Sequence, residues 1–255
     1  MKLSLLSAAI KEAPSLIRSA KLAAISQVKA PSAKCPICGF FGKFRGFGDP
    51  VRTAAQCPRC WSLERHRLFA LAVERSVITF ADKDVLSFAA EAAIGNLVKG
   101  ARSYKTSNYP HANGADFALN MEAIDLPDES CDMVICSHIL EHVDDRKSLA
   151  ELFRILRPGG QLIFMIPVIE GWAETYEDSS IRTDRERHVH FGQFDHVRYY
   201  GADVRERVTA AGFQLSEFTS DPVDSIHYGL LRGEKVFIGL KQKDPSESQS
   251  FSVPL

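Results

Sequence analysis

The sequence lacks the features that place a protein in a membrane or send it out of the cell. It contains no run of about 18 uninterrupted apolar residues, the length that a helix needs to span a bilayer. The short apolar stretch over residues 1–10 is broken by Lys11 and Glu12, and no small-residue cleavage site follows it. We therefore expect a soluble, cytoplasmic protein in which residues 1–29 form an amphipathic helix of the mature chain.

The chain also lacks a strong charge of either sign. Lysine and arginine number 31, aspartate and glutamate number 32, and the formal net charge is −1. This balance argues against a protein that wraps nucleic acid with its whole surface. Residues 34–67 depart from it, since only Asp49 and Glu64 oppose the basic side chains of Lys34, Lys43, Arg45, Arg52, Arg59, Arg65 and Arg67. Such a patch could contact the phosphates of RNA, or it could be a solvated face that offsets nearby negative charge.

Cysteine is scarce, but four of the six cysteines form two Cys-Pro-x-Cys pairs. Cys35 and Cys38 make the first pair, and Cys57 and Cys60 make the second. Two thiolates separated by two residues can bind one metal ion from a tight turn, and a second such turn completes a tetrahedron. Gly39 follows the first pair at a place where such a turn often needs a positive φ. The spacing predicts a structural zinc site made by these four cysteines, in preference to a redox pair or a coincidence.

Short apolar runs alternate with helical patterns after residue 82. We expect strands over residues 85–88, 102–107, 117–119, 131–137, 161–167, 213–218 and 235–241, and helices over 61–78, 91–98, 145–157 and 202–211. The run at 131–137 holds Cys131 and Cys136 and is apolar enough to be buried on both faces, which favours reduced thiols. This alternation predicts an α/β fold with a parallel, doubly wound sheet.

Four parts of the chain follow from these patterns. They are an N-terminal amphipathic helix over residues 1–33, a small four-cysteine zinc ribbon over 34–60, one α/β domain over 61–243, and a flexible polar tail over 244–255. Phe40, Phe41, Phe44 and Phe47 lie between the cysteine pairs, where we expect them to cover the metal and dock the ribbon. The polar stretch 170–195 is longer than an ordinary connection, and such loops often cover active sites.

Three sequence segments carry a resemblance to a known family. DLPDESCDMV at residues 125–134, SHILEHV at 137–143 and RPGG at 157–160 resemble the second half of class I S-adenosylmethionine-dependent methyltransferases. CPRCWSLERHR at 57–67 and FGQFDHVRYYG at 191–201 are similar to a bacterial zinc-ribbon subgroup of that family, mostly of unknown substrate. The resemblance covers about residues 35–241. It implies a Rossmann-like methyltransferase sheet with S-adenosylmethionine as cofactor and structural Zn²⁺ in the ribbon.

The residues expected to hold the cofactor share one position, because ligands of open α/β sheets bind at the carboxyl ends of the strands. They are Phe88, Ala89, Glu91, Asn108, Asn120, Met121 and Ser137. The chain has Ser-Phe-Ala-Ala-Glu where the family usually has a Gly-rich loop, and it has Asn108 where an acid usually binds the ribose. We expect the small alanines to replace the glycines. Glu91 either binds the ammonium group of the cofactor or only interacts favourably with the dipole at the N-terminus of its helix. Weakened cofactor binding is one consequence of this departure.

The expected roles of the remaining site residues stay open between two interpretations. Met121 is either a flexible apolar wall for the adenine or a buried core residue. His138 follows the fourth strand, where it could orient the acceptor or take its proton, and we name it as the catalytic candidate. The segment 187–198, near the lid that we expect over 170–195, carries His188, His190, Asp195, His196, Arg187 and Arg198. Its two arginines would suit an acidic or phosphate-bearing acceptor, or the segment holds a surface ion-pair cluster.

Three functions are compatible with these residues. The first is methyl transfer from S-adenosylmethionine to a small molecule or to a glycan or lipid precursor. The second is methylation of RNA, with the basic ribbon as the reader. The third is a binding or scaffold protein without catalysis, which the missing Gly-rich loop and Asn108 would explain.

Overall fold

The computed structural model describes residues 32–48 and 51–243, so the predicted helix over 1–29 and the tail over 244–255 lie outside the described residues. The described residues form two compact units, one from the chain before residue 75 together with Ser220–Glu234, and one from Arg75–Thr219 together with the described residues after 234. This division differs from the predicted boundary at residue 60. Residues 61–74 and the segment 220–234 cluster with the ribbon. None of the described helices combines the length and apolar character needed to cross a bilayer.

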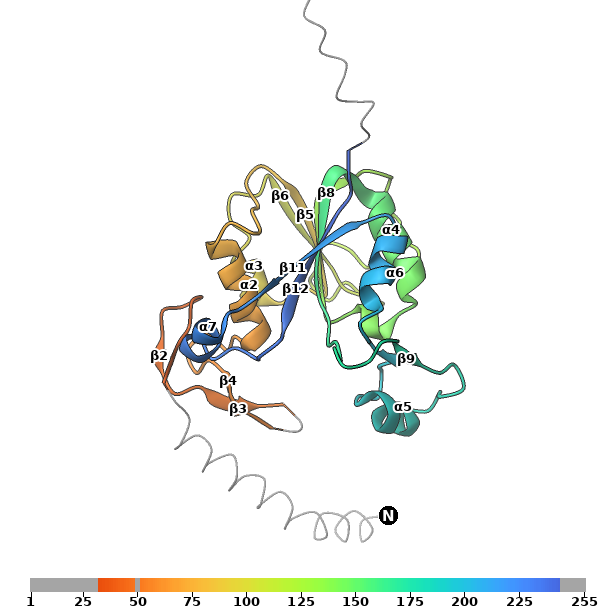
Figure 1. The fold of residues 1–255 in the computed structure, drawn as a ribbon. Helices are drawn as coiled ribbons and strands as arrows, with labels where there is room; N and C mark the ends of the chain where they lie inside the picture. The colour runs from red at the N-terminus through yellow and green to blue at the C-terminus, as the bar shows by residue number, and fades with distance from the viewer. Residues whose placement is uncertain (1–31, 49–50, 244–255) are drawn as a thin grey trace, which may run out of the picture. The chain divides into compact units, whose positions relative to one another are not determined.

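The larger unit is built on a six-stranded sheet with the order β11-β12-β8-β7-β5-β6 (Figure 1). Its strands are β5 (Asp84–Phe88), β6 (Ser103–Ser107), β7 (Cys131–Ser137), β8 (Leu156–Met165), β11 (Gln214–Thr219) and β12 (Lys235–Leu240). β5 pairs in parallel with β6 and β7, and β7 pairs in parallel with β8. β12 runs antiparallel to both β8 and β11. The prediction of an α/β methyltransferase-like sheet is confirmed, and β12 is the strand that departs from the predicted parallel arrangement.

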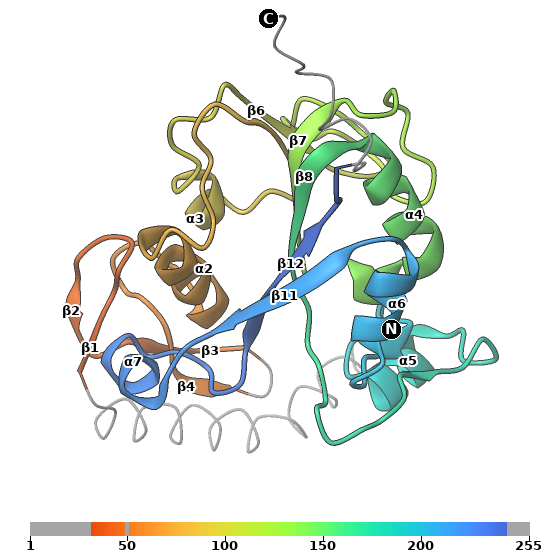
Figure 2. The ribbon, with the colours of Figure 1, turned by 45° about the horizontal axis from the view of Figure 1, so that its top comes forward.

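The helices of this unit cover both faces of the sheet. α4 (Asp145–Ile155) and α6 (Val204–Ala210) lie on one side, and α3 (Ala92–Gly95) lies on the other (Figures 1 and 2). α4 begins where predicted, because the Asp144 carboxylate accepts a hydrogen bond from the Lys147 N–H at 3.2 Å. β7 is buried on both faces, as its apolar run predicted, with Met133 and Cys136 fully enclosed.

Several predicted boundaries differ from the observed ones. Residues 117–119 form no strand, since Phe117 makes only an isolated parallel bridge to Ser107. β8 starts at Leu156, five residues before the predicted start, and includes the Pro-Gly-Gly sequence that follows α4. α2 (Glu64–Glu74) and α3 are shorter than the predicted helices. The expected loop over 170–195 contains β9 (Tyr176–Glu177), which pairs with β10 (Arg198–Tyr199), and α5 (Asp184–Phe191).

The smaller unit is a ribbon of short hairpins. β1 (Ala33–Lys34) pairs with β2 (Phe41–Gly42), and β3 (Arg45–Phe47) pairs with β4 (Arg52–Gln56), both antiparallel. α2 and α7 (Pro222–His227), a helix that the sequence did not indicate, complete the unit. Its small core is made of Ala33, Cys35, Phe44 and Cys57.

Candidate functional site

The strand order places a ligand-binding edge at the carboxyl ends of β5 and β7. The chain leaves β5, adds β6 on one side and then adds β7 on the other, so the order reverses between β5 and β7. Phe88 at the end of β5 is in register with Ser107 of β6 and Cys136 of β7. The residues that follow these three positions therefore leave the sheet along one edge, which is where open α/β sheets bind their ligands. The structure thus brings the predicted site residues Ala89, Asn108 and Ser137 to the same edge.

The turn after β5 takes the place of a Gly-rich loop. Ala89 has a φ of 43°, in the left-handed region that costs an L-residue about 1–2 kcal/mol. Its N–H donates to the Ser107 carbonyl at 2.8 Å, which fixes the turn beside β6. Glu91 is the N-cap residue of α3 but makes no side-chain capping bond there. A methyl group is the largest side chain on this turn before Glu91, so the backbone stays open to close approach by a ligand.

Asn108 and Asn120 hold the two loops that follow β6. The Asn108 side-chain N–H donates to the Ala112 carbonyl at 3.0 Å, which leaves its side-chain oxygen as a possible acceptor for a ligand hydroxyl. The Asn120 side-chain oxygen accepts from the Glu122 N–H at 3.0 Å, so Asn120 shapes its own turn. Glu122 in turn accepts from the Asp144 N–H at 2.9 Å and ties this loop to the start of α4.

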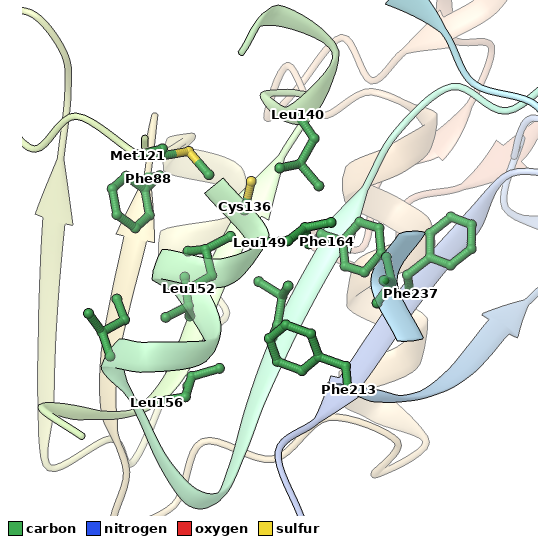
Figure 3. Packing of buried hydrophobic residues seen from close by; sticks show 14 of the residues in the cluster. Phe88, Met121, Cys136, Leu140, Leu149, Leu152, Leu156, Phe164, Phe213 and Phe237 are labelled. Carbon is green, nitrogen blue, oxygen red and sulfur yellow. The ribbon is translucent and has the colours of Figure 1, made fainter. Parts of the chain in front are cut away.

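Met121 lies in the core of the sheet. It is only 5 % exposed and belongs to the buried cluster that includes Phe88, its neighbour in Figure 3. Of the two interpretations of Met121, the buried core residue is therefore the one that its surroundings favour. It can support the floor of a site, but its side chain has little freedom to adapt to a ligand.

Three buried polar atoms, one in the last residue of β7 and two in the segment after it, have no hydrogen-bond partner among the described residues. They are Ser137 Oγ, His138 Nε2 and Glu141 Oε2. His138 itself has a φ of 54°, and its Nδ1 lies 3.2 Å from Glu141 Oε1. A carboxylate can only accept, so Nδ1 carries a proton, and in the neutral form of the ring Nε2 then keeps its lone pair. Unpaired buried polar atoms are costly, and a group of them at a ligand-binding edge marks a functional site.

A pair of histidines lies beside Glu141. The rings of His142 and His196 meet edge to face, with their centroids 4.6 Å apart. His142 Nδ1 is 3.3 Å from both the carbonyl oxygen and the carboxylate of Asp195, and His196 Nδ1 is 3.2 Å from the Phe191 carbonyl. Burial lowers the pKa of His196, while the charge of Glu141 opposes that shift. In the sequence, Glu141 and His142 stood only within the SHILEHV segment and His196 within the segment 187–198, so no pattern brought the three together.

Ion pairs connect the lid, the segment over residues 170–195, to the end of the sheet. Arg198 is 7 % exposed, donates to the carbonyls of Leu140 and Val143, and pairs with Glu177 at 2.9 Å. Arg207 links the same Glu177, at 3.0 Å, to Asp145, at 3.1 Å. Arg198 therefore belongs to an ion-pair cluster that holds the lid, as the second of the two interpretations expected.

The four cysteines of the ribbon form the predicted cluster. Their sulfur atoms lie within 4.8 Å of one another, with Cys35 and Cys60 3.6 Å apart and Cys38 and Cys57 3.7 Å apart. A tetrahedral zinc ion with bonds of about 2.3 Å separates its sulfur ligands by about 3.8 Å, so the cluster fits zinc.

The two cysteine turns have the same backbone design. The Gly39 N–H donates to the Cys35 carbonyl at 2.9 Å, and the Trp61 N–H donates to the Cys57 carbonyl at 3.0 Å. Gly39 has a φ of 73°, as predicted, and Trp61 has a φ of 63°.

Arg67 is the buried cation next to this cluster. It is fully enclosed and donates to the carbonyls of Ala55, Ser62, Tyr228 and Gly229, while its guanidinium lies 4.5 Å from the centre of the Phe44 ring. Burial lowers the pKa of Arg67, and the charges of Glu64 and of the nearby cysteines oppose the shift. A zinc ion with four thiolates carries a net charge of −2, which a buried guanidinium offsets. The donor set and its charge partner therefore both suit a structural zinc site.

The basic patch on the ribbon is smaller than the sequence predicted. Arg67 is buried, and Arg52 forms a two-pronged pair with Glu64 at 3.0 and 3.2 Å. Arg45 lies over the ring of Trp61 at 5.5 Å, and Trp61 is 60 % exposed. The phenylalanines also differ in their exposure. Phe44 is buried, whereas Phe41 and Phe47 are exposed and do not cover the cysteines, contrary to the expectation from the sequence.

Comparison with known proteins decides the family of the central segment. Residues 95–164, from α3 to the end of β8, match a family described as "Methyltransferase domain". This stretch is a methyltransferase domain. The match confirms the resemblance to class I S-adenosylmethionine-dependent methyltransferases, and it includes Asn108, the loop with Met121, and Ser137 and His138.

The relatives of this methyltransferase domain cover only part of the chain. The ubiquinone/menaquinone biosynthesis C-methyltransferase UbiE of Escherichia coli is 32 % identical over 91 residues, which are 34 % of this chain and 36 % of that protein. The chain therefore matches little more than a third of the length of this curated relative. Among solved structures, an S-adenosylmethionine-dependent methyltransferase from Mesorhizobium loti is 13 % identical, with a TM-score of 0.48 over 69 % of this chain and 98 % of that chain. The YcgJ protein of Bacillus subtilis is 12 % identical, with a TM-score of 0.48 over 70 % and 100 %.

Proposed function

We propose that this protein transfers a methyl group from S-adenosylmethionine to a small molecule or to a glycan or lipid precursor. The observation that carries the proposal is the set of unpaired polar atoms after β7, at the strand-order reversal of a sheet whose central segment is a methyltransferase domain.

The residues at this edge fit the cofactor despite the missing Gly-rich loop. Ala89 gives the turn a left-handed residue with a small side chain, which are the two properties that a glycine usually supplies there. The side-chain oxygen of Asn108 would accept from a ribose hydroxyl, and Glu91 would accept from the ammonium group. Ser137 and His138 would lie next to the reacting part. The bound cofactor supplies a methyl group on a positively charged sulfur, and the protein has to align an acceptor with it and exclude water.

His138 is the residue we propose to act on the acceptor. Its Nδ1–H donates to Glu141, so Nε2 is a lone-pair acceptor held in a fixed direction. A hydroxyl or amine acceptor that donates to Nε2 would be oriented, and its proton would have a base to move to.

Calorimetry with S-adenosylhomocysteine and S-adenosylmethionine tests this proposal. We expect saturable binding that weakens at least about tenfold in Asn108→Ala and Glu91→Ala, the loss that one good hydrogen bond represents. Asp125→Ala is the matched control, because Asp125 is an exposed acid of the same domain outside the proposed site. No heat and no thermal stabilisation with either ligand would refute methyl transfer and leave the interpretation as a non-catalytic binding protein.

Methylation of RNA is the second candidate, and the exposed Trp61 is the observation that favours it. An aromatic face beside Arg45, with the exposed Arg59 nearby in sequence, offers both a stacking surface and phosphate contacts. We expect RNA binding by this surface to weaken steeply with salt and to be lost in the triple variant Arg45→Ala, Arg59→Ala, Trp61→Ala. Binding that is indifferent to salt and to these substitutions would exclude RNA and favour the small acceptor.

A further inference from the structure

We propose that Glu141, His142 and His196 form a second metal site, separate from the four cysteines, which binds a divalent transition-metal ion such as Zn²⁺ or Co²⁺. The ligand atoms of the three side chains lie within 4.8 Å of one another. Glu141 and His142 lie in the short 3-10 helix η1 (Leu140–His142) after β7, and His196 comes from the segment after α5, so the ion would join that segment to the end of the sheet.

The hydrogen bonds of the two histidines leave the correct nitrogen free for a metal. His142 Nδ1 faces two oxygens of Asp195, and His196 Nδ1 faces the carbonyl oxygen of Phe191. Because each of these oxygens can only accept, both histidines carry a proton on Nδ1, and the neutral form of each ring has its lone pair on Nε2. Donation from the second ring nitrogen to a carbonyl or carboxylate is the arrangement that orients metal-binding histidines in proteins.

Glu141 supplies the independent evidence for a ligand. Its side chain is only 2 % exposed, and Oε2 has no hydrogen-bond partner. The other oxygen, Oε1, is engaged by His138 at 3.2 Å, which fixes the direction of Oε2. A buried carboxylate oxygen without a partner is expensive, and an ion bound between it and the two imidazoles would remove that cost.

The donor set also indicates which class of ion binds. Two imidazole nitrogens and one carboxylate oxygen suit zinc and its first-row neighbours, whereas calcium and magnesium prefer oxygen alone. In a tetrahedral site with bonds of about 2.0–2.2 Å the ligand atoms lie about 3.3–3.6 Å apart, which is compatible with ligand atoms that all lie within 4.8 Å of one another. Three protein ligands leave the fourth position for water or an acceptor, as in catalytic zinc sites, unlike the closed four-cysteine cluster.

This site would narrow the acceptor to a molecule with a hydroxyl group, an inference that rests on the proposed methyl transfer. A divalent ion lowers the pKa of a bound hydroxyl and makes it a nucleophile at neutral pH. In the reaction, the acceptor O–H gives its proton to His138 Nε2, and the oxygen forms a bond to the methyl carbon. The bond between that carbon and sulfur breaks with its electron pair going to sulfur, and S-adenosylhomocysteine leaves as a neutral thioether.

Cobalt titration of the full-length protein distinguishes the two metal sites without measuring activity. Co²⁺ bound to four thiolates shows intense thiolate charge-transfer absorption, whereas Co²⁺ bound to nitrogen and oxygen shows only weak visible bands. We expect protein loaded with a single equivalent of Zn²⁺, which fills the four-cysteine site first, to bind one further equivalent of Co²⁺ with weak bands alone. Loss of a residue that only hydrogen-bonds to a metal ligand weakens metal binding roughly tenfold to 100-fold. Loss of a ligand itself should weaken Co²⁺ binding by more than this in each of the variants His142→Ala, His196→Ala and Glu141→Gln.

His188→Ala is the matched control, because His188 is an exposed histidine of α5 outside the cluster, and it should leave Co²⁺ binding unchanged. Circular dichroism of each variant shows whether it is folded, and Glu141→Gln keeps the shape of the side chain if the alanine variants unfold. A folded wild type without a second equivalent, or equal Co²⁺ binding by wild type and Glu141→Gln, would overturn the metal site. Binding of S-adenosylhomocysteine by the same samples tests the methyltransferase proposal separately.

Discussion

Trp61 holds the same left-handed backbone conformation in the second cysteine turn that Gly39 holds in the first. Their φ angles are 63° and 73°, and each N–H donates to the carbonyl of the first cysteine of its turn. Glycine adopts this conformation without strain, and tryptophan does not. Strain at an exposed aromatic residue is typical of a position kept for contact with a partner, which agrees with the surface that we propose for RNA.

The two turns should respond in opposite ways to substitution. Gly39→Ala should destabilise the ribbon by about 1 kcal/mol, because a Cβ at Gly39 meets no atom within 4 Å and only the backbone conformation opposes it. Trp61→Gly should not destabilise the ribbon, since it relieves the strain and removes a side chain that is 60 % exposed. Chemical denaturation of the zinc-loaded protein measures both. A large loss of stability in Trp61→Gly would show that its stacking with Arg45 is structural.

Replacement of Arg67 should cost far more than replacement of any other arginine of the ribbon. Arg67→Met removes four hydrogen bonds to buried carbonyls and the cation next to the cysteine cluster, a loss of about 3–5 kcal/mol by analogy with broken buried ion pairs. Arg59→Met is the control, because Arg59 is exposed and donates only to the Cys38 carbonyl at 3.3 Å. Thermal unfolding and zinc release by a chelator measure both effects. Equal stability of the two variants would contradict the role of Arg67 as the charge partner of the cluster.

Acid should weaken the amino-terminal edge of the sheet. The hydrogen bond from Arg102 lowers the pKa of Asp84 below its usual value of 3.8. Burial raises the pKa of Asp132, but the hydrogen bond from the Asp84 N–H and the pair with Arg157 outweigh it and lower the pKa. Because both folded-state pKa values are lowered, their contribution to stability is full above about pH 4 and is lost as the pH falls through the folded values.

The double variant Asp84→Asn, Asp132→Asn tests this prediction. Its stability between about pH 4 and pH 2 should change less with pH than that of the wild type, as followed by urea denaturation at each pH. If stability falls with pH as steeply in the double variant as in the wild type, other carboxylates dominate the pH dependence.

Two substitutions of Ala89 should separate its two roles in the proposed cofactor turn. Ala89→Gly should keep or improve binding of S-adenosylhomocysteine, since glycine removes the strain of a φ of 43° and adds no bulk. Ala89→Val should weaken binding at least about tenfold, because a β-branched residue is a strong outlier at positive φ and its methyl groups narrow the turn. Calorimetry compares the two variants. Normal binding by Ala89→Val would show that the cofactor does not approach this turn.

Much of the sheet was predictable because its signals are local. The strand at 131–137 was predicted to the residue, since an unbroken apolar run between polar residues marks a strand buried on both faces. The start of the helix at residue 145 was also predictable, because an aspartate directly before a helical pattern can cap the helix. The direction of β12 was not, because two antiparallel strands at the end of a chain give the same apolar pattern as two parallel ones. Residues 117–119 failed as a strand because the Asp116 carboxylate takes the Thr106 N–H at 2.9 Å, and a single bridge remains.

The candidate site also has features that local sequence predicts and features that only the tertiary structure shows. Sequence alone determined the four cysteines, the positive φ of Gly39 and the residues at the ends of β5, β6 and β7, because each depends on spacing or on neighbouring residues. Only the tertiary structure decided that Arg67 and Arg52 are engaged within the ribbon, that Met121 is a core residue, and that Glu141, His142 and His196 come together. Those outcomes depend on contacts between residues far apart in the chain. Such contacts determine which arginines and histidines are buried and hydrogen-bonded, and residues of the same type look alike in the sequence.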